Sequence, residues 1–248
     1  MRFIFVALLT LCGLHPALAA PDEHVVKLAS LEWPPYASAS VSAGGTVTDT
    51  VRRALAASGY RLVVEYFPWP KAVAVGESAK GFAGYFPSYY SADRARRTEL
   101  SDPVGESPLG FAQRSDSPST WVTIEDLKAL RIGVVEGYIN TTALDRRIAS
   151  GDQPADSTLD DASNLMKLAA GRVDLAVVDS KVFANLMGND TRLTGLRGQL
   201  VMNPRLLELK SVHVAFRKTS EGRKLSRALS EGLRKIGYQP PVFNQDPE

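Results

Sequence analysis

The sequence is poor in the residues that build covalent or metal-based frameworks. Its 248 residues include one cysteine and three histidines. A single cysteine excludes an internal disulfide framework and a cysteine-rich zinc site. The net charge is also small, +2 from 29 basic and 27 acidic residues, so a protein that coats nucleic acid or another polyanion is not expected. With 44% hydrophobic residues, the chain can instead bury an ordinary globular core.

Most short catalytic signatures are absent as well. We find no Gly-x-Gly-x-x-Gly after a strand, no P-loop, no Gly-x-Ser-x-Gly elbow and no His-Glu-x-x-His. His24 and His213 are far apart and lack metal-ligand spacing, and the apolar strand around His213 favours a packed structural role. We therefore expect neither a cofactor, nor a bound metal, nor an enzymatic activity.

The first 19 residues have the order of a signal peptide. Arg2 precedes an apolar run over 3–14, which is too short to span a bilayer, and Ala17-Leu18-Ala19 offers a cleavage site. The sequence predicts cleavage after Ala19 and export to the periplasm, with a short buried helix as the alternative. No later segment reaches the roughly 18 apolar residues of a membrane span.

Strand and helix patterns then alternate along the chain. Apolar runs that are bounded by turn residues predict strands at 25–29, 61–67, 83–86, 131–135, 173–178 and 212–216. Periodic segments predict helices that start at Thr46 or Thr48, after Pro68, and over 140–148, 160–170 and 220–236. This alternation is typical of an α/β protein with a mostly parallel sheet.

A polar break over 113–119 divides the pattern into two halves. After it, the start Thr123-Ile124-Glu125-Asp126 resembles a capping box, and the strand and helix alternation begins again. We expect lobe 1 to comprise 20–106 and 212–248, and lobe 2 to comprise 107–211. The chain would cross between them near 105–108 and 209–213, which is where we place the hinge.

Three local features are candidates for a binding site, and each has a simpler explanation. Trp33, Tyr36 and Trp69 lie beside prolines at the ends of predicted strands, where ligands of open α/β sheets bind, but they could equally pack the lobe surface. Arg94 lies in a run of three arginines that could be a solvated basic face. Asp179 follows an apolar strand and could simply cap the helix that starts at Ser180.

Taken together and in order, these motifs resemble the bacterial family 3 extracellular solute-binding proteins, the periplasmic receptors of polar-amino-acid transporters. The likeness covers nearly the whole chain after the leader. It rests on Pro34-Pro35-Tyr36, on Ser91-Ala92-Asp93-Arg94 with Ser101-Asp102-Pro103 at the family's spacing, and on Gly171-Arg172-Val173-Asp174 with Asp179 five residues further on. The resemblance implies a two-lobed periplasmic-binding-protein-like fold of type II, each lobe a mostly parallel sheet flanked by helices.

The resemblance also implies how the site residues divide their roles. Arg94 would hold a ligand carboxylate and Asp179 its ammonium group, while Tyr36, Trp33 and Trp69 would pack on the ligand body. The two charged groups come from different lobes, so a zwitterion would bridge the lobes and drive their closure.

The sequence departs from the family pattern at several positions around this site. Gly137 and Tyr138 stand where the family has a Gly-Thr pair that helps to hold the carboxylate. Ala83 replaces the usual acid before the strand that leads to Arg94. Ser88 lies in the stretch 86–90, which is bulkier than the family's Ser/Thr-rich segment.

The resemblance implies a monomeric periplasmic protein that captures a small polar ligand, an amino acid or a related zwitterion or organic acid, and delivers it to an ABC transporter permease. One alternative is a ligand-sensing subunit for a membrane signalling protein. The other is an enzyme on the same fold that resembles the cyclohexadienyl dehydratases, for which Glu136 is the one acid that we can name.

Overall fold

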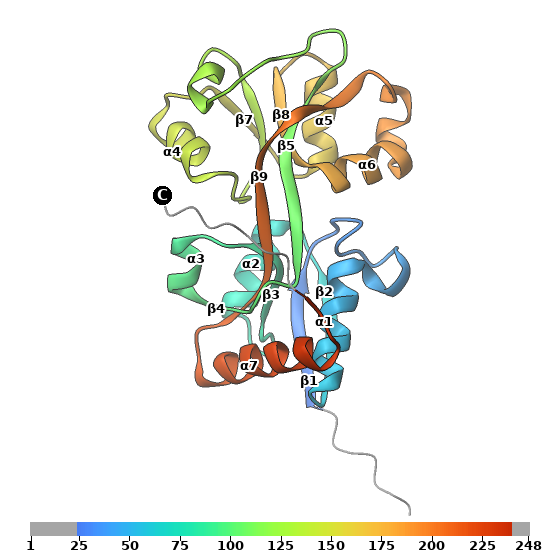
Figure 1. Cartoon of the computed structure of the whole chain (residues 1–248), viewed down its shortest axis with the longest axis vertical. Helices are drawn as coiled ribbons and strands as arrows, with labels where there is room; N and C mark the ends of the chain where they lie inside the picture. Colours follow the sequence, from blue (N-terminus) through green and yellow to red (C-terminus); the bar gives the residue numbers. More distant parts are fainter. Residues whose placement is uncertain (1–23, 240–248) are drawn as a thin grey trace, which may run out of the picture.

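The computed structural model describes residues 24–239, and its ribbon forms two lobes stacked along the long axis (Figure 1). Lobe 1, the lower lobe of the figure, holds β1 (His24–Ser30), α1 (Thr46–Ala57), β2 (Tyr60–Tyr66), α2 (Trp69–Ser78), β3 (Gly84–Tyr89), α3 (Ala92–Arg97), β4 (Thr98–Leu100) and α7 (Ser220–Lys235). Lobe 2 holds β6 (Ile132–Val135), α4 (Thr142–Ser150), β7 (Ala155–Thr158), α5 (Asp161–Ala169), β8 (Leu175–Asp179) and α6 (Ser180–Asn189). Short 3₁₀ helices lie at Ser42–Gly44, Ile124–Leu127 and Thr191–Leu196.

The sheet of lobe 1 is built around the parallel strands β1, β2 and β3. β1 pairs with both β2 and β3, and β3 then pairs antiparallel with β9 (Leu200–Arg217). Helix α1 begins after Gly45 rather than at a threonine cap, which corrects the expected cap at Thr46 or Thr48. Gly45 has a φ of +100°, and a Cβ there would lie 2.5 Å from the carbonyl oxygen of Tyr36. Only glycine therefore allows the turn around Tyr36 to pack against the start of α1.

Lobe 2 repeats the arrangement with its own parallel strands. β6 pairs parallel with β7 and with β8, as the alternation of apolar runs and helices predicts. The capping box between Thr123 and Asp126 is present, and the Asp160 side chain caps α5 by accepting from the backbone N–H of Ser163. Leu144, Leu165 and Leu168 are fully buried in this lobe and belong to the same apolar cluster as the buried residues of lobe 1.

Two long antiparallel strands pass from one lobe to the other (Figure 1). β5 (Gly105–Arg114) and β9 pair with each other, and the register places Gly105 opposite Val212 and Pro108 opposite Leu209. They join the strands into one sheet with the order β2-β1-β3-β9-β5-β8-β6-β7. The sequence predicts only residues 212–216 of β9 and nothing of β5, so the connection between the lobes is more regular than expected.

The α/β class, the two-lobed fold and the main helices are confirmed by this architecture. The predicted signal peptide lies outside the described residues. Within residues 24–239, no helix is both long enough and apolar enough to cross a membrane.

Candidate functional site

A small cavity lies at the junction of the two lobes, and half of its lining residues are aromatic. Its walls include Trp33 after β1, Trp69 at the start of α2, Tyr89 at the end of β3 and Tyr138 after β6, together with Leu31, Pro87, Arg94 and Ile139. The cavity holds only about 20 Å³ of free space, roughly room for one water molecule. The structure thus brings four expected site residues together, namely Trp33, Trp69, Arg94 and Tyr138.

Arg94 is a buried cation with few partners. It lies in the short helix α3, whose N-cap Ser91 accepts from its backbone N–H, and the residue is only 5% exposed. Its Nη1 donates to the Ser88 hydroxyl over 3.1 Å, and its guanidinium lies 5.5 Å from the Trp69 ring centroid. Its Nε has no hydrogen-bond partner, and no acid of residues 24–239 forms an ion pair with it. Burial lowers the Arg94 pKa, as expected for a desolvated cation.

Asp179 has four hydrogen-bond donors in this structure. Oδ1 accepts from the backbone N–H groups of Lys181 and Val182. Asp179 therefore caps α6, which is the simpler of the two roles that its position in the sequence predicts. Oδ2 accepts from the hydroxyls of Tyr36, at 2.8 Å, and Ser107. Asp179 is 1% exposed, and burial raises its pKa. It does not line the cavity that Arg94 lines, so a direct bond from a ligand ammonium to Asp179 stays a prediction.

Several side chains of lobe 1 contact lobe 2. The Tyr36 hydroxyl donates to Asp179, and the Trp69 indole N–H donates to the carbonyl of Gly137 over 2.9 Å. Gly137 has a φ of +75°, and its Cβ position lies 3.4 Å from Trp69, so glycine suits both the turn and the close approach. Tyr138 completes the set, because its ring is T-shaped to both Trp33 and Trp69, with centroids 6.5 and 6.2 Å apart.

Sequence reasoning missed Asp161, which is a second buried acid beside this junction. It is 6% exposed and accepts from the Tyr138 hydroxyl over 3.2 Å. Burial raises its pKa to about 7, and the charges of Asp179 and Asp160 act in the same direction. The Trp33 indole N–H is close enough to lower that pKa, although it lies outside hydrogen-bond geometry. No sequence signal distinguishes Asp161 from an ordinary acid in the first turn of a helix.

The remaining expected residues lie around this centre. Ser88 is 1% exposed and joins Arg94 to the β3 backbone, since its hydroxyl also donates to the Tyr89 carbonyl. Glu136 is exposed and does not line the cavity. His213 is buried, hydrogen-bonds Ser101 and Ser211, and has a pKa lowered by burial, which fits the packed role. Among residues 24–239, no three His, Cys, Asp or Glu side chains form a group that could hold a metal.

Comparison with known proteins places the fold but not a family. No family model matches the sequence, and the search of curated proteins finds no relative. Among solved structures, a histidine kinase sensor domain with similarity to periplasmic binding proteins has a TM-score of 0.72 at 24% identity, covering 87% of this chain and 92% of that chain. The arginine-bound ArgBP of T. maritima (Gly52Ala mutant) has a TM-score of 0.69 at 17% identity, covering 86% and 95%. The glutamate-bound GluR0 ligand-binding core of Nostoc punctiforme has a TM-score of 0.67 at 19% identity, covering 86% and 94%.

Proposed function

We propose that this protein is a monomeric periplasmic solute-binding protein that encloses a small carboxylate-bearing ligand between its lobes and delivers it to an ABC transporter. The N-terminal sequence supports export, and the fold is that of proteins whose names describe amino-acid binding. The observation that carries the proposal is the buried guanidinium of Arg94 at the wall of the junction cavity, with no acid of the described chain paired to it. A buried cation without a counter-charge is costly unless a ligand supplies that charge.

Arg94 suits the carboxylate end of the ligand. A guanidinium can form two parallel hydrogen bonds to a carboxylate, and Lys cannot. The two buried acids, Asp161 and Asp179, lie on the lobe 2 side of the same junction and give that side a negative character. The ligand would therefore be oriented with its anionic group at lobe 1 and its cationic group toward lobe 2. Contacts with both lobes favour the closed state over the open one.

The hinge proposed at 105–108 and 209–213 lies where β5 and β9 pair with each other. Small changes in backbone angles along two paired strands can tilt one lobe against the other while the pairing persists. Closure would then bring the Tyr36 and Trp69 contacts into place across the junction. A membrane permease could distinguish the two arrangements by shape.

A sensing role is the second candidate, because one of the similar structures is the sensor domain of a histidine kinase. Ligand capture would be the same, but the closed shape would report to a membrane signalling protein. Neighbouring genes for a permease and an ATPase would favour transport, and a neighbouring kinase gene would favour sensing.

A thermal-shift screen against amino acids, small peptides, amines and organic acids tests the binding proposal. A ligand at 100 times its Kd stabilises the folded protein by about 2.7 kcal/mol, which raises Tm by several degrees in a protein of this size. We expect hits to carry a carboxylate. If none of the carboxylate-bearing compounds raises Tm, the proposal is wrong.

The Arg94→Ala variant tests the assignment of the anion site. Loss of one partner of a buried charge pair costs about 3–5 kcal/mol, so calorimetry should show binding weakened at least a hundredfold. Arg96→Ala is the matched control, because Arg96 lies in the same helix with its side chain 72% exposed. Equal affinity of Arg94→Ala and Arg96→Ala for the best screen hit would refute the assignment.

A further inference from the structure

The wall of the junction cavity has the composition of a cage for a cation. We call Trp33, Trp69, Tyr89 and Tyr138 the aromatic cage; all four rings line the cavity. Trp33 forms T-shaped pairs with Tyr89 and with Tyr138, and Trp69 forms one with Tyr138. In such pairs the partly positive C–H edge of one ring meets the negative face of the other. The free space is small because the rings contact one another, so a ligand has to take the place of these edge contacts.

Most of the hydrogen-bond acceptors beside the cage are already in use. Asp179 has four donors, which fills the roughly four lone-pair positions of a carboxylate. The Tyr89 hydroxyl pairs with that of Ser107, and Oδ2 of Asp161 accepts from Tyr138, whereas Oδ1 of Asp161 accepts no hydrogen bond from residues 24–239. A primary ammonium brings three N–H donors. Oδ1 of Asp161 can accept one of these donors, but a donor that is buried without an acceptor is costly. This closed arrangement therefore has too few free acceptors for a primary ammonium.

A fully methylated ammonium has no N–H to satisfy. Its positive charge is spread over C–H surfaces that pack on the faces of Trp and Tyr rings, which is how proteins recognise quaternary ammonium groups. The surroundings strengthen this attraction, because Tyr36 and Tyr138 both donate their hydroxyls to buried acids. A phenol that donates to a carboxylate gains electron density on its ring, so Tyr138, which lines the cavity, should offer a more negative face.

Arg94 supplies the opposite pole in the same cavity. Its guanidinium lies over the Trp69 ring, and its Nε is buried without a partner. This cation would repel a simple quaternary amine, but it would attract one that also carries a carboxylate. We infer that the ligand is a betaine, a small molecule that joins a carboxylate held by Arg94 to a fully methylated ammonium held by the aromatic cage. This inference rests on the proposed function and narrows its ligand class.

A methylation series tests the inference on the full mature chain. Calorimetry would measure the affinities for glycine, N-methylglycine, N,N-dimethylglycine and N,N,N-trimethylglycine, and for 4-aminobutanoate against its trimethylated form. We expect a betaine to bind at least tenfold more tightly than the primary amine of the same chain length. Choline lacks the carboxylate, so it should bind more weakly than trimethylglycine. The inference is overturned if the primary amine binds as tightly as its trimethylated partner, or if neither betaine binds. If a primary amino acid binds through Arg94 as tightly as its trimethylated form, the betaine inference is wrong but the proposed function is not.

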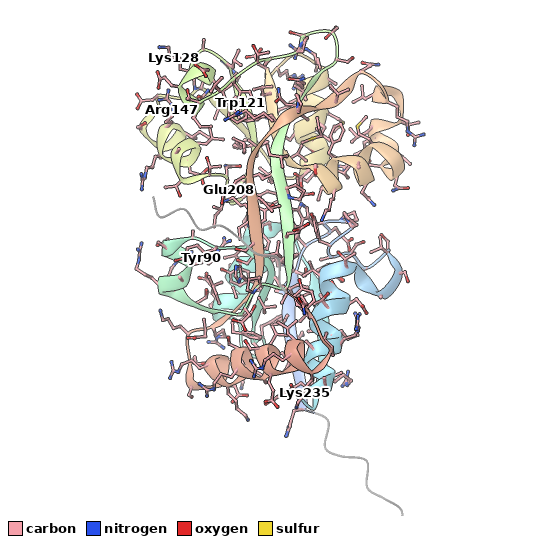
Figure 2. The ribbon with its side chains drawn as sticks, in the orientation of Figure 1. Tyr90, Trp121, Lys128, Arg147, Glu208 and Lys235 are labelled. Atoms are coloured by element: carbon pink, nitrogen blue, oxygen red, sulfur yellow. The ribbon has the colours of Figure 1, made fainter. Side chains whose placement is uncertain are left out.

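Two tryptophan variants separate the cage from general stability. Trp33→Phe keeps a ring but weakens the negative face; it also removes an indole N–H that lies near Asp161, outside hydrogen-bond geometry. Trp121→Phe is the matched control, and Trp121 lies in the upper lobe of Figure 2. Its indole N–H is also buried without a partner, its ring packs against Phe111, and it does not line the cavity. We expect Trp33→Phe to weaken trimethylglycine binding severalfold and Trp121→Phe to leave it unchanged. Equal affinities of the two variants would argue against the cage.

Discussion

The hydrogen bond from Tyr36 to Asp179 gives a prediction that needs no ligand. Tyr36→Phe keeps the ring, which stacks on Trp33 with centroids 4.6 Å apart, and removes only the hydroxyl. Asp179 then keeps three of its four hydrogen-bond donors. Because Asp179 is only 1% exposed in the wild-type structure, water does not readily replace the lost donor. A hydrogen bond to a charged group contributes about 1.5–3 kcal/mol. We expect a loss of that size.

Because this bond joins the two lobes, the lost free energy can appear in either of two measurements. Tyr36 belongs to lobe 1 and Asp179 to lobe 2, so the bond exists only while the lobes are closed. If the lobes unfold as one unit, urea denaturation will report the loss directly. If they open before they unfold, the same energy shifts the ratio of open to closed molecules about 10- to 100-fold. Small-angle scattering would then give a larger radius of gyration for the variant.

Tyr90→Phe is the matched control for this experiment. Tyr90 follows β3 in lobe 1 and is 51% exposed (Figure 2), and a surface change of this kind moves stability by less than about 0.5 kcal/mol. A double-mutant cycle with Ser107→Ala would measure how far the two hydroxyls on Oδ2 support each other. If Tyr36→Phe matches Tyr90→Phe in both stability and radius of gyration, the bond does not hold the lobes together.

Two further predictions concern the lobe 2 side of the junction. The Asp161 pKa is raised to about 7 in the fold from 3.8, so between these values the folded protein binds one more proton than the unfolded chain, and stability falls as pH rises. Asp161→Asn, which resembles the protonated acid, should therefore match the wild type near pH 4 and exceed its free energy of unfolding by about 2–4 kcal/mol at pH 8; parallel pH profiles of the two proteins would contradict this. Gly137→Ala forces a left-handed conformation on alanine and should lower the free energy of unfolding by about 1–2 kcal/mol, whereas Gly188→Ala, inside α6 with open space at its Cβ, should not lower it. Urea denaturation compares the last two variants, and a loss of equal size in both would remove the strain argument.

The fold was predictable where apolar periodicity reports burial on one side. β1, β8 and α7 follow this rule, and their boundaries differ from the expected ones by only a few residues. β5 and the first part of β9 escape it for a physical reason. Pro108 and Gly110 interrupt β5, and β9 carries Glu208 and Lys210 where it passes between the lobes. A strand that bridges two lobes has no single buried face, so it shows no alternation of apolar and polar residues.

The site was predictable where a residue type is costly to bury and belongs to a spaced motif. Arg94, Trp33 and Trp69, which the sequence singles out, line one cavity, and their contact with a ligand stays a prediction. Asp161 lies outside every motif, and only its burial against Tyr138 in the folded chain reveals it. Asp179 belongs to a motif, yet the fold gives it four donors, which no spacing in the sequence could show.

The balance of charge at the junction argues for a ligand with two poles. Arg94, Asp161 and Asp179 are all at least nine-tenths buried, and within residues 24–239 none of them forms an ion pair. A fold selected for stability alone would gain by replacing such groups with apolar side chains of similar volume. Asp179 has a structural reason to stay, because it caps α6 and joins the lobes. Arg94 has one neutral partner in Ser88 and an unpartnered Nε, and under the proposed function its counter-charge is an anion that arrives with the ligand. On lobe 2, Asp161 with its raised pKa would face the positive pole of such a ligand. A positive group brought close to that acid would favour its ionised form, so binding would release a proton.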